Sequence, residues 1–264
     1  MPKISVIMGI HNTNNVIMVK QAIDSILNQS YSDFEFIICD DGSTDNTYDV
    51  VNNLIKKDSR CILIQNKTNK GLAQTLNNCL KIAKGEYIAR MDADDISELN
   101  RFELQINFLE NNKEYGLVSG WGELFDENGI FSIRKYIEKP TKENMLFGSP
   151  FLHAGCMMRK EVLVKLKGYR VSKETRRAED YDLWMRLYAL GYKGYNLQKV
   201  IYKIREDKNA YKRRKYRFRI DEAKVRYYGF KRLGLFPKGY IYILKPLIVG
   251  LIPQKILSII RKER

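Results

Sequence analysis

Several widespread signals are missing from this 264-residue sequence. There is no G-x-G-x-x-G motif after the first apolar segment and no G-x-x-x-x-G-K-[ST] motif, which argues against a dinucleotide-dependent dehydrogenase and against a P-loop nucleotide hydrolase. The four cysteines form no C-x-x-C pair and there are only two histidines, so we expect reduced, buried thiols and no structural zinc site. The apolar run at the N-terminus is too short for a signal peptide, and we therefore expect a cytoplasmic protein.

Positive charge is abundant but unevenly distributed. The formal net charge is +15, and residues 205–264 contain 18 Lys and Arg against five Asp and Glu. The preceding 204 residues are therefore nearly neutral, and the 44% of apolar residues in the chain allows a sizeable core. We predict one domain over residues 1–204 and a basic, helical C-terminal tail over residues 205–264.

The first 92 residues alternate between two hydrophobic patterns. Short, continuous apolar runs rich in Ile and Val predict buried strands, whereas apolar residues every three or four positions predict helices. The predicted strands cover residues 3–10, 34–40, 60–65 and 86–91, and the predicted helices cover residues 14–29, 43–57 and 71–85. Because such alternation produces right-handed crossovers, we predict an α/β fold with a mostly parallel central sheet.

The pattern changes after about residue 98. Helical spacing recurs in residues 99–112, 159–169 and 178–191. Between the first two of these segments, residues 115–139 resemble strands with a hairpin that turns at the Glu-Asn-Gly sequence of residues 127–129.

Acidic and small residues follow three of the predicted strands, in segments 9–12, 40–43 and 92–95. Ligands of an open parallel sheet bind beyond the carboxyl ends of its strands, so we expect these segments to meet at one rim. The close carboxylates of Asp92, Asp94 and Asp95 repel one another, and oxygen ligands of this kind suit Mg²⁺ or Mn²⁺ held together with substrate phosphates. A helix cap is the alternative interpretation of segment 40–43, and a solvated acidic turn is the alternative for segment 92–95.

Asp180 is a candidate general base because of its spacing. The buried stripe predicted for its helix consists of Leu183, Trp184, Leu187 and Leu190. Asp180 lies three and four positions before the first two of these, on the same face and one turn earlier. We expect a carboxylate at the end of an apolar face to lie at the rim of a cleft. Partial burial there raises its pKa toward the range that a general base needs. A carboxylate that only stabilises the helix start is the alternative, and Glu179 fits that role as well.

Four blocks of the sequence resemble, in the same order, the family 2 glycosyltransferases with the GT-A fold. The blocks are ISVIMGIHN, DFEFIICDDGSTDNT, NKGLAQTLNNCLKIAKGEYIARMDADD and AEDYDLWMRL, and the resemblance covers about residues 3–200. It implies an inverting enzyme of the type found in bacterial polysaccharide biosynthesis. Such an enzyme uses a nucleotide-sugar donor, usually a UDP-sugar, a divalent cation (Mn²⁺ or Mg²⁺) and a saccharide or lipid-linked saccharide acceptor.

The resemblance also implies roles for single residues. Asp41 matches the uracil-binding aspartate of the family, and Asp180 matches its catalytic base. Asp92 and Asp94 match its D-x-D motif, with Asp94 as the direct metal ligand and Asp92 as a contact to donor and metal.

Four further residues are implied at the rim of the site. Gly9 and His11 fall in the donor site, at positions where the family more often has Pro or Thr and Tyr, respectively. His153 falls where the family often has a histidine near the acceptor or phosphates. Glu179 is expected to contact the acceptor or phosphates as well. A structural role for a lone histidine is an equally good interpretation of His153.

Two other functions are left open by the sequence. A nucleotidyltransferase would use a similar acidic metal site, although no Lys or Arg follows the first strand before Lys20 to bind a triphosphate. An RNA-binding protein would explain the basic and aromatic residues of segment 211–228. We expect no nucleic-acid partner, because RNA binding leaves the acidic cluster unexplained.

The basic tail predicts contact with a membrane surface. Residues 240–260 are apolar, but Lys245 and Pro246 interrupt them, so we expect short interfacial helices at the cytoplasmic face of an anionic membrane and no spanning helix. The alternatives are that the tail packs on the catalytic domain or forms a homodimer contact. The helix predicted before it carries one apolar stripe: Tyr216, Ile220, Ala223, Tyr227 and Phe230.

Overall fold

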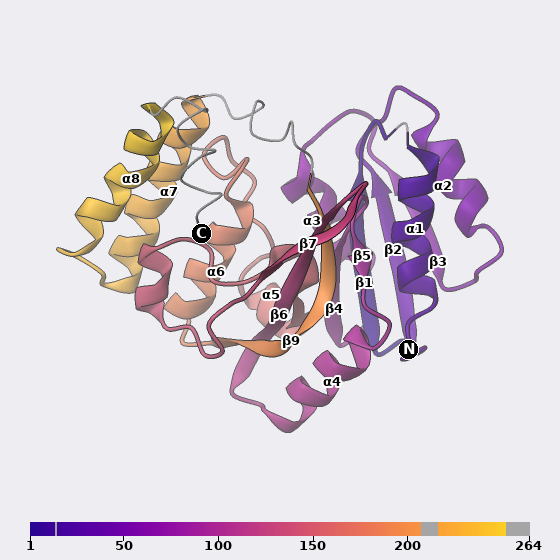
Figure 1. Cartoon of the computed structure of the whole chain (residues 1–264), viewed down its shortest axis with the longest axis horizontal. Helices are drawn as coiled ribbons and strands as arrows, with labels where there is room; N and C mark the ends of the chain where they lie inside the picture. Colours follow the sequence, from indigo (N-terminus) through magenta and orange to yellow (C-terminus); the bar gives the residue numbers. More distant parts are fainter. Residues whose placement is uncertain (14, 207–215, 252–264) are drawn as a thin grey trace.

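A large mixed β-sheet forms the centre of the computed structural model, which describes residues 1–13, 15–206 and 216–251 (Figure 1). Over these residues the sheet has nine strands in the order β3-β2-β1-β4-β8-β6-β9-β5, with β7 paired to β6. The first half of the chain supplies β1 (Ile4–Ile10), α1 (Val16–Leu27), β2 (Phe34–Asp40), α2 (Thr47–Ile55), β3 (Cys61–Gln65), α3 (Leu72–Ile82) and β4 (Tyr87–Asp92).

The parallel part of the sheet matches the prediction. Strands β1, β2, β3 and β4 pair in parallel, and β1 and β2 are buried almost throughout. Continuous apolar runs suit this position because both faces of these strands are covered by helices. One core layer packs α1, α2 and α4 (Arg101–Asn111) on one face, and a second packs α3, α5 (Lys160–Lys165) and α6 (Glu179–Ala189) on the other.

The second half of the chain extends the sheet with antiparallel pairs and with one long parallel pair. It supplies the strands β5 (Ile96–Ser97), β6 (Tyr115–Asp126), β7 (Gly129–Arg134), β8 (Met157–Arg159) and β9 (Lys193–Arg205) and the short 3₁₀ helices η1 (Lys142–Leu146) and η2 (His153–Gly155). The predicted hairpin is confirmed as β6–β7, with Gly129 at φ +113° beside the turn. Strands β5, β8 and β9 were not predicted. Polar residues interrupt β9, and β5 and β8 are too short to show a period.

Two predicted helices differ from those observed. Helix α2 starts at Thr47 and not near residue 43, because the Ser43 side chain bonds to Asp40 and the Asp45 carboxylate accepts from the Thr47 backbone N–H at 3.0 Å. The polar side chains therefore build a turn before the helix instead of capping it. Helix α5 is confined to six residues, and positive φ angles at Lys167 and Gly168 follow it.

Two C-terminal helices, α7 (Arg217–Leu233) and α8 (Gly239–Leu251), lie side by side, with α7 packed on α6 (Figure 1). Val225, Phe230 and Leu233 of α7 join the same core cluster as Trp184 of α6. The predicted stripe is only partly right, because Ala223 and Phe230 are buried while Tyr216, Ile220 and Tyr227 are exposed. Pro246 lies inside α8, and no helix in the described parts of the chain is long and apolar enough to cross a membrane.

Candidate active site

The three predicted segments meet at one rim, because their strands are neighbours in the sheet. Strand β1 lies between β2 and β4, and its Gly9 is in register with Cys39 on one side and with Asp92 on the other. The residues that follow β2 and β4 therefore flank the end of β1. This arrangement confirms the rim that was expected from the alternation of strands and helices.

Asp41 is buried at this rim and organises the loop before α3. Its carboxylate accepts hydrogen bonds from the backbone N–H groups of Lys70 and Gly71 and from the side chain of Asn66, all at 2.8 Å. It lines a cleft of about 320 Å³ whose wall near the parallel strands consists of Gly9, Ile10, His11, Asp41, Asn69, Gly71, Leu72 and Thr75. Three donors leave little freedom to the carboxylate, so Asp41 forms a fixed edge of the cleft.

Gly9 and His11 lie on the same wall in different ways. A Cβ atom at Gly9 would come within 3.1 Å of the Thr75 side chain and 3.2 Å of the Leu72 side chain, so the absence of a side chain lets α3 approach β1 closely. His11 is exposed, and its ring is available to a ligand in the cleft.

Asp92, Asp94 and Asp95 form a compact acidic cluster. One carboxylate oxygen from each lies within 4.8 Å of the others. Desolvation, and then the negative charge of Asp92, raise the pKa of the Asp94 carboxyl to about 6. A divalent cation fits this all-oxygen set, with Asp92 and Asp94 as its predicted ligands.

Asp95 has a structural contact of its own. It is buried and accepts a hydrogen bond from the Arg205 backbone N–H at 2.8 Å. The Arg205 side chain donates to the Asp94 carbonyl oxygen at 2.9 Å. The end of β9 thus fixes the backbone of the acidic turn, and this contact could not be predicted while β9 itself was unrecognised.

Arg90 is the most informative residue that the sequence analysis missed. It is buried in β4 and forms an ion pair with Asp92, while its Nε atom has no hydrogen-bond partner in the described structure. Burial raises the pKa values of Glu179 and Asp180, and the positive charge of Arg90 opposes part of this rise. An arginine between apolar residues of a buried strand was the available signal, because an unpaired buried charge is costly.

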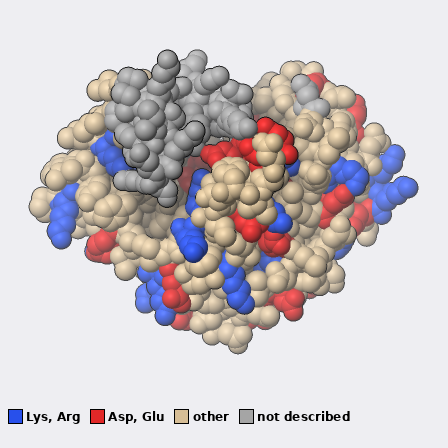
Figure 2. All heavy atoms as spheres, in the orientation of Figure 1, with Lys and Arg blue, Asp and Glu red and all other residues tan. Residues whose placement is uncertain are grey.

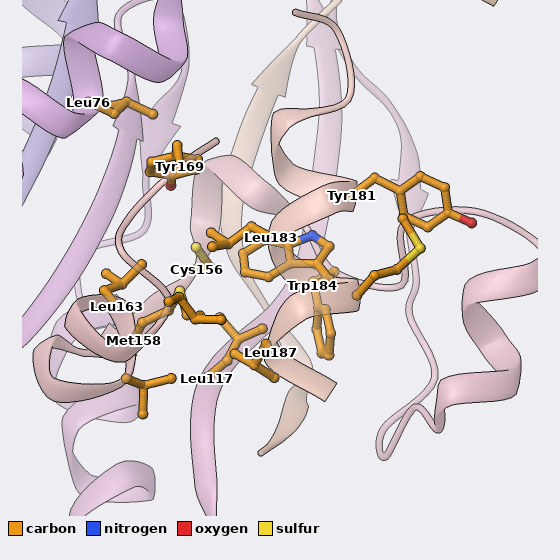
Figure 3. Packing of buried hydrophobic residues seen from close by; sticks show 14 of the residues in the cluster. Leu76, Leu117, Cys156, Met158, Leu163, Tyr169, Tyr181, Leu183, Trp184 and Leu187 are labelled. Carbon is orange, nitrogen blue, oxygen red and sulfur yellow. The ribbon is translucent and has the colours of Figure 1, made fainter. Parts of the chain in front are cut away.

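The first turn of α6 brings Glu179 into the lining of the cleft, whereas Asp180, the next residue, is not among the cleft-lining residues. Burial, and then the charge of Asp180, raise the pKa of Glu179 to about 8, and its Oε2 atom has no partner among the described residues. Burial also raises the pKa of Asp180. The predicted stripe behind it is right for Leu183, Trp184 and Leu187, as Figure 3 shows, but wrong for Leu190, which lies past the helix end and is exposed.

His153 lies behind the cleft in an aromatic setting. Its Nε2 atom is 2.8 Å from the Tyr169 hydroxyl, and the rings of Tyr169 and Trp184 contact it edge-on. Burial, and then the charge of Arg90, lower its pKa well below the usual value, so the imidazole is neutral. The cleft-lining residues do not include His153.

The cleft has a second wall, of which the sequence indicated only Glu179. It is formed by Arg176, Arg177 and Glu179 at the start of α6 and by Phe218 of α7. The Arg177 guanidinium lies 5.8 Å from the centre of the Phe218 ring. A residue of the predicted tail therefore faces the cleft, which only the packing of α7 could establish.

This geometry agrees with a match over residues 5–166 to the family described as glycosyl transferase family 2. The chain belongs to this family. It is 46% identical over its full length, and over 94% of the relative, to the putative glycosyltransferase EpsE of Bacillus subtilis. It is 34% identical to WfaP of Escherichia coli over 76% of each chain; WfaP is a UDP-Glc:α-D-GlcNAc-diphosphoundecaprenol β-1,3-glucosyltransferase.

Solved structures confirm the GT-A fold of this glycosyltransferase. Residues 1–349 of TarS from S. aureus, in complex with UDP-GlcNAc, superpose with a TM-score of 0.68 at 19% identity, over 85% of this chain and 66% of TarS 1–349. The mannosyltransferase PcManGT of Pyrobaculum calidifontis, in complex with GDP-Man and Mn²⁺, superposes with a TM-score of 0.65 at 20% identity, over 94% of this chain and 68% of PcManGT.

Proposed function

We propose that this glycosyltransferase moves a sugar from a UDP-sugar to a hydroxyl of a saccharide or lipid-linked saccharide, with inversion at the anomeric carbon. The observation that carries the proposal is the cleft of about 320 Å³, because His11 and Asp41 from the ends of the parallel strands and Glu179 from the first turn of α6 line the same cavity. The acidic cluster follows β4, the strand that neighbours β1 at this rim. Two relatives from Escherichia coli, named as a UDP-Glc and a UDP-Gal transferase acting on α-D-GlcNAc-diphosphoundecaprenol, support this substrate class.

Asp180 acts as the general base in this proposal. The acceptor hydroxyl attacks the anomeric carbon from the face opposite the diphosphate and gives its proton to the Asp180 carboxylate. The new carbon–oxygen bond forms as the bond from the anomeric carbon to the phosphate oxygen breaks, and the nucleoside diphosphate leaves with the electron pair. The raised pKa of Asp180 suits a base, because a carboxylate with an ordinary pKa is a weaker proton acceptor.

The donor is held by the other side of the cleft. Asp41, fixed by the loop before α3, is placed to accept from the uracil ring, and the His11 ring to pack on it. Asp92 and Asp94 would hold a divalent cation, which supplies positive charge for the diphosphate as it leaves. Arg176 and Arg177 add positive charge to the opposite wall.

The two other functions have less support. Family membership makes the nucleotidyltransferase interpretation unnecessary. For RNA binding, residues 211–215 of the basic segment lie outside the described residues, and Arg219 and Arg226 of α7 form ion pairs with Glu222. On the face shown in Figure 2, Lys and Arg side chains are spread over the molecule among acidic ones, unlike the single basic stripe of a nucleic-acid binder.

A thermal-shift screen tests the donor assignment. UDP-Glc, UDP-Gal, UDP-GlcNAc and GDP-Man should be compared with Mn²⁺, with Mg²⁺ and with excess chelator. We expect stabilisation by a UDP-sugar only when a divalent cation is present, followed by release of UDP on addition of an acceptor. Stabilisation by nucleoside triphosphates alone, or full transfer activity in chelator, would overturn the proposal.

We also propose that α8 places the enzyme on an anionic membrane at its cytoplasmic face. Tyr240, Ile241, Leu244, Ile248 and Leu251 are all more than half exposed and recur at helical spacing. Lys231, Arg232 and Lys238 are exposed around the connection between α7 and α8, and each basic residue near such a surface contributes about 1 kcal/mol. This surface would bring a lipid-linked acceptor to the cleft that Phe218 lines.

Vesicle co-sedimentation tests the membrane proposal. The triple variant Ile241→Ser, Leu244→Ser, Ile248→Ser should lose binding to anionic vesicles at low salt. The matched control Ile130→Ser, Phe131→Ser, Ile133→Ser, which removes exposed apolar residues of β7, should bind normally. Equal binding by both variants contradicts the proposal. A different result would assign the exposed face of α8 to a homodimer contact. In that case the wild type binds no vesicles, and light scattering shows a dimer for the wild type and a monomer for the α8 triple variant.

A further inference from the structure

We propose that Arg176 and Arg177 bind the diphosphate of the donor, and that Phe218 of α7 positions the Arg177 guanidinium for this contact. The inference rests on the proposed function, because it takes the ligand of the cleft to be a UDP-sugar. It gives the C-terminal region a part in donor binding that is separate from membrane contact.

Both arginines face the cavity that is proposed to hold the uracil ring. The cleft of about 320 Å³ has His11 and Asp41 on the wall near the parallel strands and Arg176, Arg177 and Phe218 on the other wall. This volume is near the lower end of the range for small-molecule sites, so a single nucleotide would reach both walls. A donor whose base lies at Asp41 would therefore extend its phosphates toward the arginines.

Neither arginine has an acidic partner in the part of the chain that the structure describes. Both side chains are exposed, and neither forms an ion pair or a hydrogen bond with another described residue. Arg170 and Arg186, which lie on either side of them in the sequence, both pair with Asp182, at 3.1 and 2.7 Å. Glu179 lines the same wall, but its Oε2 atom has no partner among the described residues. The positive charge at this wall is therefore available to an anionic ligand.

Guanidinium groups suit a diphosphate for two reasons. They stay protonated at every pH at which an enzyme works, and their planar N–H donors match two phosphate oxygens at once. Negative charge builds up on the diphosphate as its bond to the sugar breaks. Positive charge at this wall would therefore stabilise the leaving group as well as the bound donor.

Phe218 restricts the Arg177 side chain. The Arg177 guanidinium lies 5.8 Å from the centre of the Phe218 ring, a distance at which a cation and an aromatic face attract each other. Arg177 precedes the first residue of α6, Glu179, and its side chain is exposed. A free arginine side chain loses conformational entropy when it binds a ligand, and a contact that restricts it beforehand reduces this loss.

Phe218 is itself held by the packing of α7 on α6. Glu222 and Arg226 follow it at four-residue intervals, on the same face of α7. Arg226 is buried, donates to Glu222 at 3.0 and 3.1 Å, and donates to the Leu146 carbonyl at 3.1 Å. Its guanidinium also lies 5.1 Å from the centre of the Tyr181 ring, in the first turn of α6. The face of α7 that anchors this helix on α6 therefore also brings Phe218 to the cleft.

UDP binding to the full chain in saturating Mn²⁺ tests the arginine site. In calorimetry, the double variant Arg176→Gln, Arg177→Gln should bind UDP about tenfold more weakly than the wild type. Uridine, which has no phosphate, should bind both proteins equally in ligand-observed NMR. The matched control Lys173→Gln, Lys224→Gln also removes two exposed positive charges, but from positions outside the cleft lining, and should bind UDP like the wild type.

A double-mutant cycle with Arg177 tests the role of Phe218. Phe218→Leu should lower the UDP affinity about threefold, because an aliphatic side chain lacks the negative face of the ring. Phe218→Tyr keeps the ring and should restore the wild-type affinity. In the Arg177→Gln background, Phe218→Leu should have no further effect, since no guanidinium is left to position. An equal loss in both backgrounds would overturn the positioning role.

The outcomes separate this inference from the function on which it rests. If the wild type binds neither UDP nor a UDP-sugar, the proposed donor is wrong and both proposals fall. If the wild type binds UDP and the double arginine variant binds it equally well, only the diphosphate site is wrong. An acceptor KM that rises while the UDP affinity stays unchanged also overturns this site, because the arginines would then bind the acceptor. An equal loss of UDP affinity in the lysine control would reduce the effect to overall charge and overturn it as well.

Discussion

The carboxylates near the parallel strands and those of α6 lie in different electrostatic environments. At the rim of the parallel strands, the cleft-lining Asp41 accepts three hydrogen bonds, and Asp92 at the end of β4 is paired with Arg90. On the wall formed by α6, Glu179 has an oxygen without a partner in the described structure, and burial raises the pKa values of both Glu179 and Asp180. The first group of carboxylates is neutralised or hydrogen-bonded by the protein itself, and in the proposed function it binds the donor. The second group has raised pKa values, and in the proposed function it takes up the proton of the acceptor.

The largest expected effect tests the second group. Asp180→Asn is nearly isosteric but cannot accept a proton, so transfer should fall by about 10²–10⁴-fold while donor and metal affinities stay unchanged. Single-turnover transfer, together with calorimetry of donor binding, measures the two separately. An equal loss of donor affinity would move Asp180 to the donor site and remove the distinction between the two groups.

Removal of a predicted metal ligand tests the first group. Asp94→Ala should lower metal-dependent donor binding and transfer by about 10²-fold, because a bound cation contributes several kcal/mol to charge stabilisation. Titration of Mn²⁺ in the presence of UDP measures the loss. Normal activity of Asp94→Ala would show that the acidic cluster is a solvated turn.

Asp41 should matter for stability as well as for donor binding. Asp41→Ala leaves the N–H groups of Lys70 and Gly71 without their acceptor, which should cost about 1–3 kcal/mol of unfolding free energy. Denaturant unfolding without ligand measures this cost. A variant that loses UDP affinity at unchanged stability would indicate that Asp41 contacts the base alone and does not build the loop.

The smallest effect concerns Glu179 and its pH dependence. Its pKa of about 8 lies above that of an unfolded glutamate, so the folded state binds more protons between these values and becomes less stable as pH rises. Glu179→Gln removes this loss, and its melting temperature should exceed that of the wild type by a margin that grows from pH 5 to pH 8. A constant margin over this range would mean that Glu179 is ionised throughout.

Much of the first group could be predicted from the sequence. Continuous apolar runs specify parallel strands, and the residues after them must share a rim because parallel strands end on the same side. Asp41, Asp92 and Asp94 were placed in this way, and with the resemblance to the family. The roles of individual site residues stay predictions, as does the division of the chain after residue 204.

The surroundings of the second group depended on contacts between residues distant in the sequence. Local spacing placed Asp180 on the face of α6 that carries Trp184, but it did not predict that the Trp184 indole N–H donates to Ser149, 35 positions earlier. It also gave no sign that Phe218 reaches the cleft or that Arg226 and Lys245 hold the Leu146 and Phe147 carbonyls. The sequence by itself determined the periodic elements, because periodicity is local, whereas only tertiary packing decided which buried polar groups became partners.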